Sequence, residues 1–129
     1  MNKMDERISA DKVMKFGLRG YKEYIDYNWH GLMIKIRTLL SRDEEYEIVR
    51  SVVECCTCYG DNGEEYIVPE NLELALRANV VIYYTDILLP NDIDEQHTLL
   101  FYSNLYDVVI EHANKAQIDS IINTLYRRI

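Results

Sequence analysis

The sequence predicts an α+β fold, mainly helical, in which a β-hairpin packs on a bundle of about four to five helices. Three observations predict it. Residues 24–37 hold two short alternating runs around turn-forming residues, residues 41–56 place an apolar stripe behind a helix-capping signal, and residues 70–129 hold further helical patterns. The 129 residues fit one domain, with a weakly patterned segment at 1–19, the hairpin at 20–40 and a helical body at 41–129.

The N-terminal segment has the weakest pattern in the chain. Met4, Ile8 and Val13 could line one face of a short helix there. From Tyr21 onward the period of the pattern changes to that of a strand.

The hairpin is predicted by two alternating runs joined by a turn at Asn28 to Gly31. The first run contains Tyr24, Ile25 and Tyr27, and the second contains Leu32, Ile34 and Ile36 with Met33, Lys35 and Arg37 between them. Because side chains alternate across a strand, we expect the three aliphatic residues to pack on the helices and the other three to form an outward row.

A helix is predicted to begin after Ser41, since Glu44 follows three residues later and completes a capping box. Its apolar stripe consists of Ile48, Val49, Val52, Val53 and Cys56. A loop is expected at residues 58–68, where Gly60 to Gly63 are strong turn formers and Pro69 suits the first turn of the next helix.

The next helix is expected to form the centre of the core, because residues 72–87 are apolar nearly all round. The run Val80-Val81-Ile82 would also suit a strand, but its continuity with the preceding residues favours a helix. Pro90 is expected to end it. One or two short helices fit behind the acidic residues Asp92, Asp94 and Glu95, and a last helix is predicted from Asn114, with Gln117 three residues on.

Charge and composition constrain the class of partner. The formal net charge of −8 disfavours direct binding to nucleic acid or to an anionic membrane surface. The first residues lack the apolar core of a signal peptide, and the longest apolar run is interrupted by Thr85 and Asp86. We therefore expect a cytoplasmic protein with protein partners. Eleven tyrosines suit contact surfaces as well as cores.

Candidate chemical sites have weak support. Cys55, Cys56 and Cys58 are an odd number of neighbouring cysteines that are poorly placed to bridge each other, so reduced thiols are expected. The cluster also lacks the second ligand pair of a structural zinc site. Gly60 to Glu65 resembles part of a calcium loop but lacks its alternating acidic positions. Cys58, His97 and Asp94 could be combined into a hydrolytic triple, yet no nucleophile motif accompanies them. We expect no catalytic residue, no metal site and no cofactor.

An acidic surface gives an alternative function. Asp43, Glu44, Glu45 and Glu47 could imitate a phosphate backbone, in which case the protein would inhibit a host nucleic-acid-binding defence complex. Each acidic cluster also lies where a helix start or a turn would place acids anyway, and that interpretation is favoured.

A family resemblance is carried by "YIDYNWHGLMIKIRTLLSRDEEYEIVRSVVECC" together with "YIVPENLELALRANVVIYYTDILLP". Across roughly residues 20–126, this pattern resembles small proteins encoded in the structural-gene region of tailed bacteriophages, and is tail assembly chaperone-like. The resemblance implies a non-enzymatic protein of the host cell cytoplasm that binds phage structural proteins, such as the tape-measure protein or another tail protein, and forms a homo-oligomer.

The hairpin is the predicted interaction element, because a two-stranded unit leaves an edge that can pair with another strand. The predicted partner-binding residues are Trp29, Met33, Lys35 and Arg37. Aromatic residues and arginine are enriched among binding hot spots. The helical surface around Tyr102 and Tyr106 is the alternative location.

Overall fold

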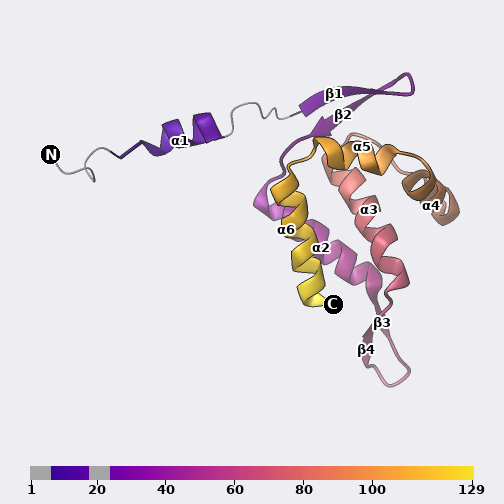
Figure 1. The fold of residues 1–129 in the computed structure, drawn as a ribbon. Helices are drawn as coiled ribbons and strands as arrows, with labels where there is room; N and C mark the ends of the chain where they lie inside the picture. The colour runs from indigo at the N-terminus through magenta and orange to yellow at the C-terminus, as the bar shows by residue number, and fades with distance from the viewer. Residues whose placement is uncertain (1–6, 18–23) are drawn as a thin grey trace.

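The structure is a computed structural model that describes residues 7–17 and 24–129. Within those ranges it contains six helices and two separate two-stranded antiparallel sheets (Figure 1). The mainly helical α+β class is thereby confirmed. Met4 and Tyr21, named above in the N-terminal patterns, lie outside the described residues. A short helix is present as α1 (Ala10–Gly17), which contains Val13 but begins after Ile8.

The predicted hairpin is formed by β1 (Tyr24–Trp29) and β2 (Leu32–Arg37). The turn is tighter than predicted: only His30 and Gly31 lie between the strands, with φ values of 51° and 88°. Positive φ at both central residues is typical of a type I′ turn, whose twist matches that of the two strands. Asn28 and Trp29 therefore belong to β1 rather than to the turn.

The predicted capped helix is confirmed as α2 (Arg42–Cys56). The backbone N–H of Glu44 donates to Ser41 Oγ at 3.2 Å, and the Ser41 N–H donates to Glu44 Oε1 at 3.0 Å. The helix buries Ile48, Val49, Val52 and Cys56. The capping box and the apolar stripe were the two signals that predicted it.

The loop predicted at 58–68 was wrong in part, because the chain forms a second hairpin there. Its strands are β3 (Thr57–Tyr59) and β4 (Glu65–Ile67), with Cys58 opposite Tyr66. The turn formers predicted a loop correctly between the strands, where the Gly60 N–H donates to the Glu64 carbonyl oxygen at 2.8 Å. Three-residue strands are too short for an alternating pattern to be recognised.

The central helix is α3 (Glu70–Tyr84), which contacts α2, α4 and α5 and buries Leu76, Val80, Val81 and Tyr84. The helical interpretation of Val80-Val81-Ile82 is confirmed. The predicted end near Pro90 was wrong, because Thr85 is already extended. The Thr85 hydroxyl donates to the Val81 carbonyl oxygen at 2.6 Å, and Thr85 forms an isolated bridge with Ile36 of β2. Pairing with the hairpin thus replaces the next helical turn.

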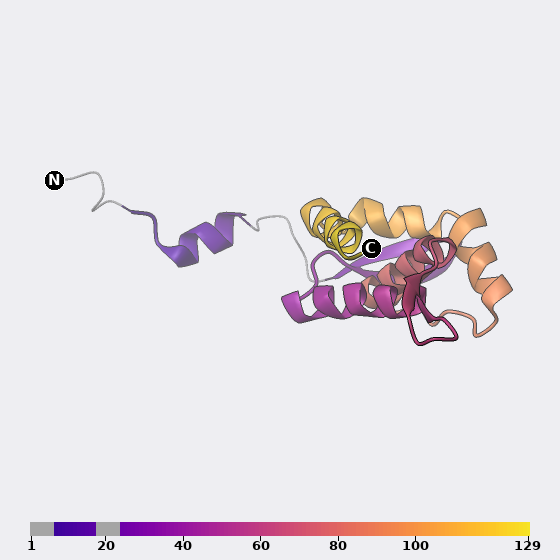
Figure 2. The ribbon, with the colours of Figure 1, turned by 90° about the horizontal axis from the view of Figure 1, so that it is seen from below.

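The remaining helices are α4 (Ile93–Tyr102), α5 (Leu105–His112) and α6 (Lys115–Arg128). Asp92 caps α4 and Asn114 caps α6, each accepting from a backbone N–H three residues on. The pattern allowed one or two helices after Pro90, and two are present. Figure 2 shows α2 on one side of the body and α5 with α6 on the other, and α2 contacts both α3 and α6.

Candidate interaction surface on the β1–β2 hairpin

The two faces of the β1–β2 hairpin differ sharply. One face packs on the helical body: Ile34 and Ile36 are buried, and Ile25, Tyr27 and Trp29 pack against the core. Leu32 was predicted to join this set but is 62% exposed. It follows the turn directly, opposite Trp29, at the tip of the hairpin.

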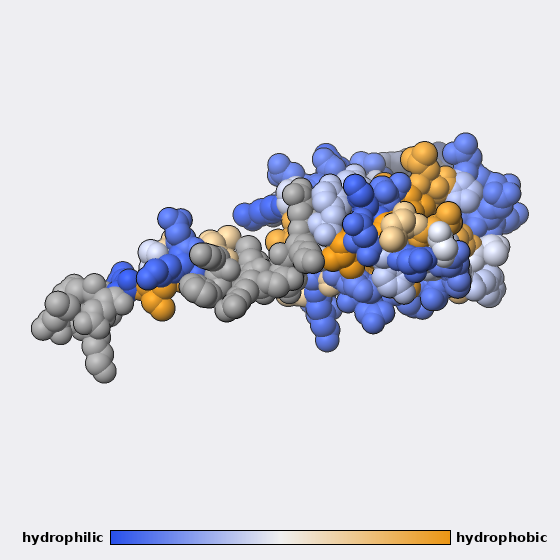
Figure 3. All heavy atoms as spheres, turned by 90° about the horizontal axis from the view of Figure 1, so that it is seen from above, coloured by the Kyte–Doolittle hydropathy of each residue, from blue (hydrophilic) through white to orange (hydrophobic). Residues whose placement is uncertain are grey.

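The outward face carries the predicted row. Met33 is 67% exposed, and Lys35 is also exposed. The register places Asn28 opposite Met33 and Asp26 opposite Lys35, so these four residues share one face. Figure 3 views the molecule from the hairpin side and shows hydrophobic atoms in patches among hydrophilic ones. This face offers a mixed surface of one exposed thioether, one ammonium group, one carboxylate and one carboxamide.

Arg37 lies in the predicted row but is not an outward side chain. Its Nη1 donates to Glu44 Oε2 at 2.6 Å, and its side chain is only 23% exposed. Burial on its own would raise the pKa of Glu44, but the hydrogen bonds from Arg37 and Ser41 outweigh it and lower the pKa below its usual value. Arg37 therefore joins the hairpin to the start of α2, and its assignment to the outward surface was wrong.

Trp29 is also held by the body. Its indole Nε1–H donates to Asn104 Oδ1 at 2.8 Å, at the N-terminus of α5. Its ring lies on the inward face and is half-buried. The predicted partner-binding residues thus separate into two groups: Met33 and Lys35 face outward together, whereas Trp29 and Arg37 fix the hairpin to the helices.

The two long edges of the hairpin are occupied differently. The outer edge of β2 meets Thr85 through its bridge with Ile36, and the Lys35 N–H donates to Asp86 Oδ1 at 3.1 Å. Among residues 7–17 and 24–129, no third strand pairs with β1. Because hydrogen-bonding direction alternates along a strand, Tyr24, Asp26 and Asn28 direct their backbone groups toward this open edge.

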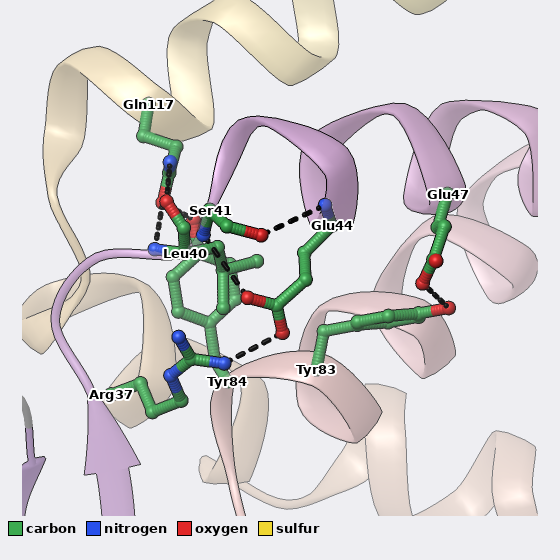
Figure 4. A network of polar contacts seen from close by, with 8 residues as sticks. All are labelled: Arg37, Leu40, Ser41, Glu44, Glu47, Tyr83, Tyr84 and Gln117. Carbon is green, nitrogen blue, oxygen red and sulfur yellow. Dashed lines mark hydrogen bonds and ion pairs between the residues drawn. The ribbon is translucent and has the colours of Figure 1, made fainter.

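A buried polar network fixes the chain where it leaves the hairpin (Figure 4). Gln117 Oε1 accepts from the Leu40 N–H at 2.7 Å and from the Tyr84 hydroxyl at 2.6 Å. Gln117 Nε2 donates to the Leu40 carbonyl oxygen at 2.9 Å. Three elements, α3, α6 and the segment after β2, are joined by this one side chain. The orientation of the hairpin relative to the body is therefore well defined.

The alternative acidic surface is partly used inside the molecule. Glu44 binds Arg37 and Ser41, and Glu47 accepts from the Tyr83 hydroxyl at 3.0 Å. Asp43 is exposed and Glu45 is half-buried. The four carboxylates are adjacent on the first turns of α2, but two of them have structural partners.

The other alternative, the aromatic surface, was wrong for one of its two residues. Tyr102 is 79% exposed, but Tyr106 is only 7% exposed and lies beneath Arg77, whose guanidinium carbon is 4.7 Å from the ring centroid. Burial raises the pKa of Tyr106 to about 12. Tyr106 therefore packs in the core and offers no contact surface.

The candidate metal ligands are dispersed in the part of the chain that the structure describes. No group of three or more histidine, cysteine or acidic side chains there could hold a metal ion. The three cysteines are free: Cys55 is exposed, Cys58 is half-buried and Cys56 is buried. Burial raises the pKa of the Cys56 thiol. His97 stacks on Phe101 at a centroid separation of 4.6 Å.

Among the described residues, no helix has the length and apolar character required to cross a membrane. Comparisons of the chain with protein-family models, with curated proteins and with solved structures gave no match.

Proposed function

We propose that the protein is a non-enzymatic accessory protein of a tailed bacteriophage, which binds structural proteins during tail assembly in the host cytoplasm. The observation that carries this proposal is the hairpin: it is fixed rigidly to the body, yet it presents an open β1 edge and exposed Leu32 and Met33. The resemblance of residues 20–126 to small phage structural-region proteins supports the biological setting.

The expected mode of binding is strand addition to β1. An extended partner segment would obtain backbone hydrogen bonds from Tyr24, Asp26 and Asn28. Met33 and Lys35 lie on β2, about 10 Å from such a segment, and would contact the part of the partner that covers the outward face. Backbone pairing gives affinity for many extended segments, and the outward row gives specificity. A tape-measure protein or another tail protein with an exposed extended segment is the expected partner.

The experiment is affinity capture of the tagged protein from phage-infected cells, comparing the natural chain with Met33→Asp/Lys35→Glu. These two residues are preferable to Trp29 and Arg37, whose replacement would also break contacts with the body. Lys115→Glu is a control for the lysine replacement, since it makes the same charge change as Lys35→Glu at an exposed position at the start of α6.

Tail components should be recovered with the natural chain and with Lys115→Glu. Recovery with the double variant should fall about 30-fold, because the loss of a binding anchor costs about 2 kcal/mol or more. Recovery of host metabolic proteins alone, or equal recovery with all three chains, would count against the proposal. If instead the protein inhibited a host defence complex, neutralising Asp43, Glu44, Glu45 and Glu47 should abolish binding.

A further inference from the structure

We propose that helix α1 of one copy docks into an apolar groove between α2, α3 and α4 of a second copy, so that the protein associates through exchanged N-terminal arms. This inference does not depend on the proposed function. It follows from an unpartnered amphipathic helix and an unfilled groove, which occur in the same chain.

Helix α1 has an apolar side that its own body leaves uncovered. On this side Val13 and Met14 are 55% and 60% exposed. Lys12 lies about 100° from Val13 and about 160° from Met14 around the helix, and so points away from this pair. Both ribbon views show α1 clear of the helical body (Figures 1 and 2), and Figure 3 shows hydrophobic atoms at its surface.

The groove has a volume of about 500 Å³ and is lined mainly by α3. Ala75 and Ala78 of α3 line it, together with Ile82 and Ile93, which are 49% and 62% exposed. Cys55 lies on the α2 wall. Small residues along one helix face allow another helix to approach closely.

The two parts match in length. The eight residues of α1 extend about 12 Å, and the α3 wall from Asn71 to Ile82 extends about 18 Å, at about 1.5 Å per residue. Helix α1 with its short flanks can therefore lie along the groove within its ends.

The charges are complementary as well. Residues 1–23 carry six basic and four acidic side chains, whereas residues 24–129 carry eight basic and eighteen acidic ones. Glu47 and Glu54 are exposed and lie about one turn to either side of Ser51, which lines the groove. A weakly basic arm would therefore be attracted to an acidic body, and this attraction favours a second copy of the chain over an acidic partner.

Cross-linking through the native Cys55 tests the arrangement directly. In a Cys58→Ser background, Val13→Cys should form a disulfide with Cys55 of another copy under mild oxidation, giving a covalent dimer on a non-reducing gel. Lys12→Cys, at a position that points away from the apolar side of α1, is the matched control and should form little dimer. Adding Cys55→Ser should remove the Val13→Cys dimer. Cys56 is buried and should not compete.

Light scattering during size exclusion gives the second measurement. The natural chain should associate in a concentration-dependent way, and Val13→Asp and Ile82→Glu should each weaken association about tenfold or more, since each removes one buried apolar contact. Lys12→Ala should associate like the natural chain.

Several outcomes would overturn the inference. A natural chain that stays monomeric would exclude exchange between copies and would leave the groove to another protein. A disulfide within one chain would show that α1 folds back on its own body. Equal dimer yield from Val13→Cys and Lys12→Cys would indicate random collision instead of docking.

Discussion

Gln117→Leu should be strongly destabilising, although leucine has nearly the same size and suits a helix. The buried glutamine side chain serves three partners, the Leu40 N–H, the Leu40 carbonyl oxygen and the Tyr84 hydroxyl. Leucine would leave all three without a hydrogen bond in the interior. Each such group costs about 1–3 kcal/mol, so we expect a loss of about 3–9 kcal/mol in the free energy of unfolding.

A companion variant separates this mechanism from a general loss of packing. Tyr84→Phe removes one hydrogen bond and leaves Gln117 bound to both backbone groups of Leu40, so it should cost only about 1 kcal/mol. The double variant, Gln117→Leu with Tyr84→Phe, lacks the Tyr84 hydroxyl that Gln117→Leu alone leaves without a partner. The combined cost should therefore be smaller than the sum of the two single costs.

Urea unfolding followed by circular dichroism gives the three free energies. Because a domain of this size is stabilised by about 5–15 kcal/mol in total, Gln117→Leu should shift the midpoint visibly toward lower urea. A loss below about 1 kcal/mol for Gln117→Leu, or strictly additive costs, would refute the assignment of Gln117 as the junction of the hairpin and the helices.

Three further variants test separate contacts. The pKa of Glu44 in the folded protein is lowered from its usual value of 4.5, so its carboxylate stabilises the fold above that pH and loses this effect on acidification. The difference in unfolding free energy between the natural chain and Glu44→Gln, measured by urea unfolding, should therefore shrink between about pH 6 and about pH 3. Gly31→Ala places a Cβ at φ 88° and should cost about 1 kcal/mol in thermal unfolding. Arg77→Leu removes a hydrogen bond to Leu100 and a guanidinium stacked 4.3 Å from the Phe101 ring, so thermal unfolding should show a loss of roughly 2 kcal/mol. An unchanged stability in either variant, or a constant difference for Glu44→Gln, would contradict the corresponding contact.

Local signals predicted the elements that local interactions stabilise. The capping box at Ser41 and Glu44 and the cap at Asn114 involve residues a few positions apart, and both were confirmed. The alternation of residues 32–37 correctly predicted the strand β2. The early end of α3 depends on a contact between Thr85 and Ile36, which are far apart in the sequence. No pattern within the helix itself contains that information.

The candidate surface was predicted only in part, because contacts that form on folding decide which of its side chains face outward. Alternation alone placed Met33, Lys35 and Arg37 in one row, and Met33 and Lys35 are exposed as expected. Arg37 turns toward Glu44 because the start of α2 passes close to the end of β2, which only the folded chain reveals. The exposure of Leu32 likewise depends on how far the hairpin extends beyond the body.

The central claim is that a protein partner binds the open edge and outward face of the β1–β2 hairpin. Amide hydrogen exchange, measured for the natural chain with and without a tail protein recovered by capture, tests it most directly. The claim predicts slower exchange in residues 24–37 on binding, with Met33→Asp/Lys35→Glu showing no such protection at the same partner concentration. Protection confined to residues 43–47, to the α2–α3–α4 groove or to α6, with residues 24–37 unchanged, would contradict it.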